Sequence, residues 1–361
     1  MAVPHGIPIL TAPSRSNSRP RRRQPPFPWI CLLGLLLLMT TLPGCGLIFD
    51  AVHRIYPVTT NELDRICLRQ QVQVGMAVEP FRPFVFPAVW TDEGARVTGL
   101  DTELVRAISD ALSVHCGAPI RPALHLVRFR DLFLLLNEGQ LDFFVSAVTA
   151  GLPSPHRSGF AYSTPYFTPS GLGAIAAKQD VIDRIETRLR TEAHVAARAN
   201  LLDGLTVAVQ DSTAAHLYMD ATLPTASLLV CDSLPAAFEH AASGATPAID
   251  VILGAHPVLE FVLKTTRKDW RLLTREGNRP LYFAQTDYAV VMAEESDKLR
   301  WFINRVIFDL DETGRLRHMR QRWLDESYAY PRRASAEGLA FDVNKMPAHY
   351  AQGTCRESSP H

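Results

Sequence analysis

The sequence of 361 residues lacks the patterns that most enzymes and metal proteins show. Its six cysteines form no C-x-x-C pair, and its twelve histidines show no metal-ligand spacing. The patterns G-x-S-x-G and H-E-x-x-H are absent, as is a phosphate-binding glycine loop. These absences favour a protein that is not an enzyme and that needs neither a metal nor a cofactor.

The chain also lacks net charge, because Lys plus Arg and Asp plus Glu number 37 each. That balance hides an asymmetry. Residues 1–44 contain five arginines and no acid, which leaves 32 basic and 37 acidic residues in the rest. The slightly acidic remainder of the chain lacks the excess of basic charge that attracts nucleic acid, so we predict no nucleic-acid partner. Hydrophobic residues make up 47%, which excludes a disordered chain.

No apolar run is long enough to cross a membrane. The longest, Trp29–Met39, falls well short of the ~20 residues that a bilayer requires. Arginines precede this run and small residues follow it, which predicts a secretory signal over residues 1–44. The exit, Leu42-Pro43-Gly44-Cys45, resembles a bacterial lipobox, in which Cys45 would carry palmitate and anchor the protein to the membrane. We therefore expect a lipid-anchored protein on the periplasmic face of the envelope, with an ordinary signal as the alternative.

Export changes what the remaining cysteines can do. With Cys31 removed and Cys45 lipidated, the mature chain keeps Cys67, Cys116, Cys231 and Cys355. An oxidising compartment permits disulfides. Cys67 and Cys116 flank one predicted strand–helix unit and are the favoured pair. Cys231 lies in an apolar strand, so we expect it to be a buried thiol.

Strands and helices alternate after a predicted tether at residues 45–60. Val72–Val78 has β-branched residues at alternate positions, as in a strand. Leu104, Ile108 and Leu112 share one helical face, and Asp101 is a plausible cap for that helix. The first unit has strands at 72–78, 124–129 and 141–148 and helices at 101–112 and 131–137. This alternation predicts an α/β fold with a parallel sheet.

The same alternation recurs further along the chain. The second unit has strands at 205–209, 227–230 and 249–253 and helices at 213–219 and 235–242, with a helical insertion at 180–200. Residues 171–176 and 288–292 are apolar and extended, and we interpret them as crossings between the units. Two α/β lobes joined by two crossings place a cleft at the carboxyl ends of the strands.

The lobes have boundaries that follow from these patterns. The first lobe comprises residues 61–169 and 290–327, and the second comprises residues 170–289. Residues 328–361 are rich in Pro, Ser and Ala without clear periodicity and are interpreted as a C-terminal tail.

Four fragments resemble motifs of the periplasmic solute-binding proteins of family 3, the amino-acid-binding components of ABC importers. The fragments, in order, are Val74-Gly75 through Phe84, Gly99–Leu104, Leu136–Asp142 and Phe160–Tyr166. They resemble the family's first strand and aromatic-x-Pro-Phe loop, its G-F-D-x-D-L, its L-x-x-G-x-x-D and its F-S-x-P-Y. The resemblance implies a two-lobe periplasmic-binding-protein fold of type II.

The resemblance also implies a function. The protein would capture a small carboxylate-bearing solute, an amino acid or a relative, by closing its lobes, and deliver it to an ABC permease. One alternative is a ligand-binding sensor or accessory lipoprotein that serves no transporter. Another is an enzyme on the same scaffold.

Three residues are candidates for holding the carboxylate of the ligand. By the resemblance, Arg157 stands where the family's carboxylate-binding arginine stands, and an arginine offers the planar bidentate donor that a carboxylate prefers. Thr149 would contribute from a strand end and Thr213 from a helix start on the second lobe. Five extra residues, 151–155, separate Thr149 from Arg157, so the arginine is either in the family's place or displaced.

Aromatic side chains are expected to form the walls of the site. The resemblance places Phe81 and Phe129 where the family has rings that sandwich the ligand, and a ring face also attracts an ammonium group. Phe84 follows a proline in the same loop and is expected to be packing.

One position departs from the family. Ala255 stands where the family has the acid that binds the ligand's ammonium, and a buried ammonium without a carboxylate is costly. Either Glu79 or Asp287 replaces that acid, or the ligand has no α-amino group. His256 would then donate to an acidic ligand, with a surface histidine as the alternative.

Overall fold

The structure is a computed structural model that describes residues 61–79, 81–150, 157–191, 198–222, 225–265, 267, 269–325, 337–345 and 353–358. The predicted signal, the lipid site at Cys45 and the tether at 45–60 lie outside the described residues, as do the extra residues 151–155.

The first lobe is built around a five-stranded sheet with strand order β4-β1-β5-β16-β7. β1 runs parallel to β4 and β5, whereas β16 runs antiparallel to β5 and β7. The first three strands therefore have the parallel arrangement that the sequence predicts. The strands are β1 (Gln71–Ala77), β4 (Arg121–Val127), β5 (Phe143–Phe144), β7 (Phe160–Tyr162) and β16 (Val291–Ala293).

Helices cover this sheet with their apolar faces. Leu104, Ile108 and Leu112 of α4 are fully buried, as the helical spacing predicts. α4 begins after Gly99, whose φ is +132° and where a Cβ atom would meet the Phe84 carbonyl oxygen at 2.0 Å, so this turn requires glycine. The helices are α3 (Glu62–Arg69), α4 (Leu100–Cys116), α5 (Phe129–Asn137), α10 (Asp297–Glu312) and α11 (Arg315–Leu324).

The second lobe is built around an eight-stranded sheet with order β18-β10-β9-β11-β8-β15-β6 and β12 paired to β8. β9 runs parallel to both β10 and β11. The strands are β6 (Thr149–Ala150), β8 (Phe167–Ala176), β9 (Thr206–Gln210), β10 (Ser227–Cys231), β11 (Val251–Ala255), β12 (Arg271–Leu272), β15 (Gln285–Tyr288) and β18 (Cys355–Glu357).

Two of the remaining helices of this lobe, α7 and α8, lie where the sequence predicts them, whereas the sequence does not predict α9 or the β13–β14 hairpin. The predicted helical insertion contains α6 and a 3₁₀ turn. The helical elements are α6 (Gln179–Thr191), η2 (Arg198–Leu202), α7 (Ala214–Thr222), α8 (Leu234–Ser243) and α9 (His256–Thr265), and β13 (Thr274–Arg275), η3 (Glu276–Asn278) and β14 (Arg279–Pro280) form a small hairpin.

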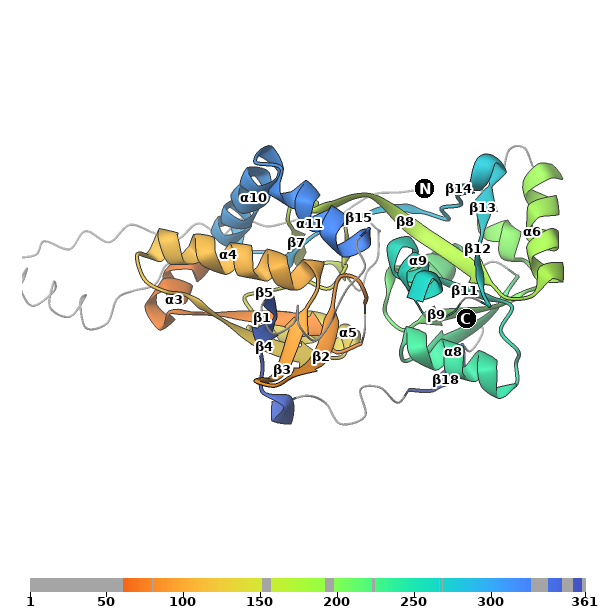
Figure 1. The fold of residues 1–361 in the computed structure, drawn as a ribbon, viewed down its shortest axis with the longest axis horizontal. Coiled ribbons are helices and arrows are strands. Elements are labelled where there is room, and N and C mark those ends of the chain that lie inside the picture. The colour runs from red at the N-terminus through yellow and green to blue at the C-terminus, as the bar shows by residue number, and fades with distance from the viewer. Residues whose placement is uncertain are drawn as a thin grey trace, which may run out of the picture. The chain divides into compact units, whose positions relative to one another are not determined.

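Two extended strands connect the lobes. Phe167, at the start of β8, belongs to the first core, and Ala174 and Ala176, near its end, belong to the second. Figure 1 shows β8 as the long strand that leads from the side of α10 and α11 to the side of α6 and β12. β15 returns antiparallel to β8. The second crossing is thus β15 rather than the predicted 288–292, because residues 291–293 already form β16 of the first sheet.

Several elements differ from the sequence prediction. The proline-rich stretch after β1 leads into a hairpin of β2 (Phe86–Thr91) and β3 (Gly94–Thr98). The predicted strand 141–148 is reduced to β5. The predicted tail contains β17 (Leu339–Ala340), η4 (Val343–Lys345) and β18, so its described parts are structured. β17 pairs with β3, and β18 pairs with β10.

Two disulfides join distant parts of the chain. Cys67 and Cys116 are bonded, with Cα atoms 5.2 Å apart, which is the pair that the sequence favours. Cys231 is bonded to Cys355, so the expectation of a buried thiol at Cys231 is wrong. The sequence did not show this pair because Cys355 lies in a stretch without periodicity. Among the helices that the structure describes, none has the length and apolar character of a membrane span.

Candidate functional site

A pocket is lined by side chains of both lobes. The first lobe contributes Phe81, Phe129, Ala147 and Arg157, β6 at the crossing contributes Thr149, and the second lobe contributes mainly the carboxyl ends of β9 and β11 and the start of α7. The remaining lining residues are Leu172, Gln210, Thr213, Ala214, Ala215, Leu234, Leu253, Gly254, Ala255, Val258 and Leu259. Strand ends and a helix start are where α/β folds bind ligands.

The pocket is narrow in this conformation. The centres of water molecules can occupy about 40 Å³ of it. A single water needs ~10–15 Å³ on this measure, so the space holds only a few waters. A solute with more than a few heavy atoms therefore requires the walls to move apart.

Arg157 is the only basic residue among the described residues of the lining, and it is nine-tenths buried. Nη1 donates to the carbonyl oxygen of Thr149 at 2.9 Å, and the guanidinium lies 5.3 Å from the ring centre of Phe133. Nη2 has no partner with hydrogen-bond geometry among the described residues. Burial lowers the pKa of Arg157, although the nearby Tyr162 side chain interacts with the guanidinium and acts to raise that pKa. A buried cation with an unpaired N–H donor is a favourable position for an anion, because the anion supplies both the opposite charge and a hydrogen-bond acceptor.

Gln210, the last residue of β9, is a lining residue that the sequence analysis missed. Its side chain is 8% exposed, and Nε2 has no hydrogen-bond partner in the described structure. The sequence feature that could have identified Gln210 is its position at the carboxyl end of a predicted strand, just before the predicted helix start. Arg157 and Gln210 thus bring unpaired N–H donors to one pocket, which favours a ligand with acceptor atoms.

Thr213 precedes α7, and the first residues of that helix, Ala214 and Ala215, also line the pocket. The Thr213 hydroxyl donates to the carbonyl oxygen of Gln210 at 2.7 Å. The N–H groups of a first helical turn have no acceptor within the helix. The start of α7 therefore offers the pocket backbone donors as well as the positive end of a helix dipole.

Phe81 and Phe129 both line the pocket, but they do not face each other across it. Their ring centres are 5.3 Å apart with the planes tilted by 51°, so the rings are in contact. No ligand fits between them, and the expected sandwich is wrong. The two rings instead form one continuous apolar wall on the first lobe.

Among the described residues that line the pocket, none carries a carboxylate. Ala255 lines the pocket, as the resemblance implies, but neither proposed replacement does. Both oxygens of Glu79 accept from the Phe129 backbone N–H, at 3.0 and 3.2 Å, at the start of α5. Burial raises the pKa of Glu79 to about 7. Asp287 lies in β15, paired with Ala150 of β6.

His256 lies outside this pocket and lines a different hollow on the second lobe, together with Glu260 and Trp270. It is 7% exposed, which excludes a surface histidine, and its ring meets Tyr282 edge to face. Gly173 makes room for it, because a Cβ there would lie 3.0 Å from the ring. Burial lowers the pKa of His256.

Asp101 supports the pocket rather than capping α4. Its buried carboxylate accepts from the Ala147 backbone N–H and from the Tyr166 hydroxyl, each at 2.7 Å. Ala147 lines the pocket with a φ of +47°. Burial raises the pKa of Asp101 to about 7. Asp101 thus holds the backbone of Ala147, a pocket residue with a strained conformation, through a buried hydrogen bond. Elsewhere in the described part of the chain, no cluster of His, Cys, Asp or Glu could hold a metal ion.

Comparison with solved structures shows the fold. An amino acid ABC transporter substrate-binding protein of Streptococcus pneumoniae bound to L-arginine is 19% identical, with a TM-score of 0.58, covering 75% of this chain and 100% of that one. An ancestral amino acid-binding protein, a precursor of cyclohexadienyl dehydratase, is 20% identical, with a TM-score of 0.57, covering 73% and 99%. A Salmonella typhimurium periplasmic binding protein with high arginine specificity is 14% identical, with a TM-score of 0.53, covering 70% and 99%.

The search of curated proteins finds no match. The sequence profile of the bacterial extracellular solute-binding proteins, family 3, matches residues 74–326. This range includes most strands of the two sheets, both crossings and every described residue of the pocket, whereas β18 lies beyond it. The chain belongs to the bacterial extracellular solute-binding proteins, family 3.

Proposed function

We propose that the protein captures a small carboxylate-bearing solute outside the cytoplasm and presents it to an ABC importer. The observation that carries this proposal is the buried, unneutralised guanidinium of Arg157 in a pocket between the lobes. Gln210 and the start of α7 add donors from the second lobe. A carboxylate would satisfy donors on both lobes at once.

The lining favours a solute without an ammonium group. A buried ammonium needs a carboxylate or several acceptors, and none of the lining residues that the structure describes is acidic. L-Arginine, which the Streptococcus pneumoniae neighbour binds, would bring two cationic groups to the same lining. Because the other lining residues are mostly leucine, valine, alanine and phenylalanine, the solute has an apolar body. We infer a monocarboxylate, such as a branched 2-oxo acid.

Closure of the lobes follows from how the donors are divided. Arg157 belongs to the first lobe, and Gln210 and Thr213 belong to the second. A ligand that touches both lobes stabilises the closed state over the open one. The narrowness of the pocket favours the interpretation that this conformation is closed. The lobes must then open before a solute can enter.

Calorimetry tests this proposal. The protein is titrated with pools of amino acids, 2-oxo acids and small dicarboxylates, and each positive pool is resolved. Arg157→Ala should weaken binding by about 30- to 1000-fold, because it removes a charge-assisted partner worth ~2–4 kcal/mol. Arg317→Ala, which removes an exposed arginine of α11, is the matched control and should leave binding unchanged. Binding that survives Arg157→Ala would contradict the proposal.

A further inference from the structure

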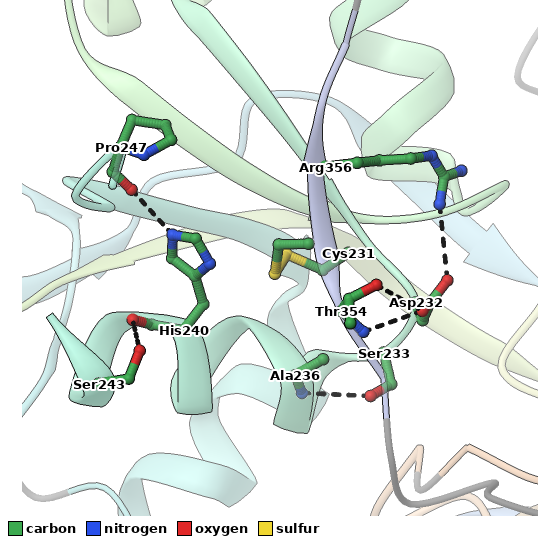
Figure 2. Close-up of a disulfide and its surroundings, with 10 residues drawn as sticks. Cys231, Asp232, Ser233, Ala236, His240, Ser243, Pro247, Thr354 and Arg356 are labelled. Atoms are coloured by element: carbon green, nitrogen blue, oxygen red, sulfur yellow. Dashed lines mark hydrogen bonds and ion pairs between the residues drawn. A yellow bond between two sulfur atoms is a disulfide. The ribbon is translucent and has the colours of Figure 1, made fainter. Parts of the chain in front are cut away.

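The C-terminal strand β18 is attached to the second lobe by backbone and side-chain bonds. β18 pairs antiparallel with β10, in the register Leu229–Glu357, Val230–Arg356 and Cys231–Cys355. The last of these pairs is also the disulfide, which Figure 2 shows between the strand and the start of α8. The disulfide therefore fixes the position of the next residue, Arg356.

Arg356 is held between two carboxylates. Nη2 donates to Asp211 Oδ2 at 2.8 Å, and Nη1 lies 3.5 Å from Asp232 Oδ1. Asp232 also accepts from the Thr354 backbone N–H at 2.9 Å, and Figure 2 shows Thr354 and Arg356 both facing this carboxylate. Without Arg356, two neighbouring acids would lose their shared cation.

Asp211 belongs to the turn that forms the second-lobe wall of the pocket. It follows Gln210 and precedes Ser212 and Thr213, and its own backbone N–H donates to the Cys231 carbonyl oxygen at 2.8 Å. A ring is thus closed: the Asp211 backbone bonds to Cys231, Cys231 is linked to Cys355, and the adjacent Arg356 returns to the Asp211 side chain. Both the backbone and the carboxylate of Asp211 are held.

Asp211 also faces the first lobe. Arg130 Nη1, in the first turn of α5, lies 3.6 Å from Asp211 Oδ2. The residue before Arg130 is Phe129, part of the pocket's apolar wall. The ion pair therefore connects one wall of the pocket to the other. His216 of α7, 3.4 Å away, is the largest influence that lowers the pKa of Asp211, and Arg356 acts in the same direction.

We propose that Arg356 and the Cys231–Cys355 disulfide are a positioning unit for the ligand site. The unit fixes Asp211, and thereby holds Gln210, Thr213 and the start of α7 in the geometry that lines the pocket. The role that we assign to this unit rests on the proposed function. The unit orders the turn whether or not a ligand is bound. Opening the disulfide would leave β18 and Arg356 held by noncovalent contacts alone, among them the β10 pairing and the Thr354–Asp232 hydrogen bond, so the order of the site depends on the redox environment.

Hydrogen exchange of the ligand-free full chain, followed by mass spectrometry, tests this. In Arg356→Ala, the amides of residues 210–217 should exchange about ten-fold faster, as expected on losing a hydrogen bond between charged groups. Exchange in α9 should stay unchanged. Cys231→Ser/Cys355→Ser should give the same local increase, whereas Cys67→Ser/Cys116→Ser, which opens the other disulfide, should not. Arg356→Lys, which keeps the charge, should restore part of the protection.

Unchanged exchange over residues 210–217 in Arg356→Ala would overturn the proposal. An equal increase in α9 would also overturn it, because the strand would then stabilise the whole lobe rather than position the turn. Neither result depends on a solute, so a failure here is distinguishable from a failure of the proposed function.

Discussion

At the scale of single residues, the pocket is defined by donors without acceptors. Arg157 is buried beside Phe133, whose ring attracts the guanidinium without neutralising it. Gln210 adds an amide that is unpaired within the described structure. Burying such groups unpaired costs stability, and a bound anion removes that cost. We propose that Ala255, which lines the pocket where the resemblance implies an acid, distinguishes it from a site for amino acids.

Restoring the acid should change the preference of the site. In Ala255→Asp, a carboxylate at the end of β11 would face the pocket and could pair with an α-ammonium group. We expect the affinity for leucine to rise about 10- to 100-fold, the range of a charge-assisted hydrogen bond. Ala255→Asn, which has a similar shape without the charge, is the control. Calorimetry showing no advantage of the aspartate over the asparagine would contradict this interpretation.

At the scale of elements, Glu79 gives α5 a start that depends on pH. Burial raises its pKa to about 7, against an ordinary value of 4.5. Between these values the folded state holds a proton that the unfolded state has released. The stability from Glu79 is therefore fully present below about pH 4.5 and is lost as the pH rises through about 7.

Glu79→Gln cannot ionise and should lack this dependence. The unfolding free energy of the wild type should fall relative to Glu79→Gln by about 3 kcal/mol between pH 4 and pH 8. Urea unfolding at both pH values measures the difference. Glu312→Gln, at an exposed position on α10, is the control. A constant difference between wild type and Glu79→Gln across this range would refute the expectation.

The two disulfides link elements that are distant in the sequence. Cys67–Cys116 joins α3 to the end of α4, and Cys231–Cys355 joins β10 to β18. Nonreducing peptide mapping should recover these two pairs, and removal of either should lower the unfolding free energy by about 2–4 kcal/mol. Recovery of all four cysteines as alkylated thiols, or in other pairings, would contradict the structure.

The sequence predicts the elements that have strong periodicity. α4 and the parallel strands β1, β4, β9 and β10 lie where apolar spacing indicates. α4 buries one regular face, and β1, β9 and β10 are largely buried. Prolines concealed the β2–β3 hairpin. β18 could not be predicted, because three residues show no period and their place is determined by a distant cysteine. In the site, Arg157, Phe81, Phe129, Thr149 and Thr213 all reach the pocket, whereas Gln210 resembles any polar strand end.

At the scale of the whole molecule, the two sheets carry separate halves of one site. The first lobe supplies the guanidinium and the aromatic wall, and the second supplies Gln210 and the start of α7. β8 and β15 connect the two cores. A solute that bonds to both lobes makes contacts that neither lobe can make alone. These contacts stabilise the closed state, which is the physical basis for closure.

The proposed anchor concerns the part of the chain before the described residues. If Cys45 is the mature first residue, radiolabelled palmitate should label the wild type and be lost in Cys45→Ser. One acyl chain gives only marginal membrane binding, so the two or three of a lipoprotein are needed to retain the protein at the membrane. An unlabelled, soluble wild-type protein would contradict the lipoprotein assignment and leave the pocket unaffected.

The most direct test of the central claim compares two ligands that differ at one group. Leucine and 4-methyl-2-oxopentanoate share a carboxylate and an apolar body, but only leucine has an ammonium. Titration of the wild-type protein with each, by calorimetry, isolates that difference. Because the described lining has a buried cation and no acid, we predict that the 2-oxo acid binds at least as tightly as leucine and displaces it. Tight binding of leucine with no binding of the 2-oxo acid would contradict the account.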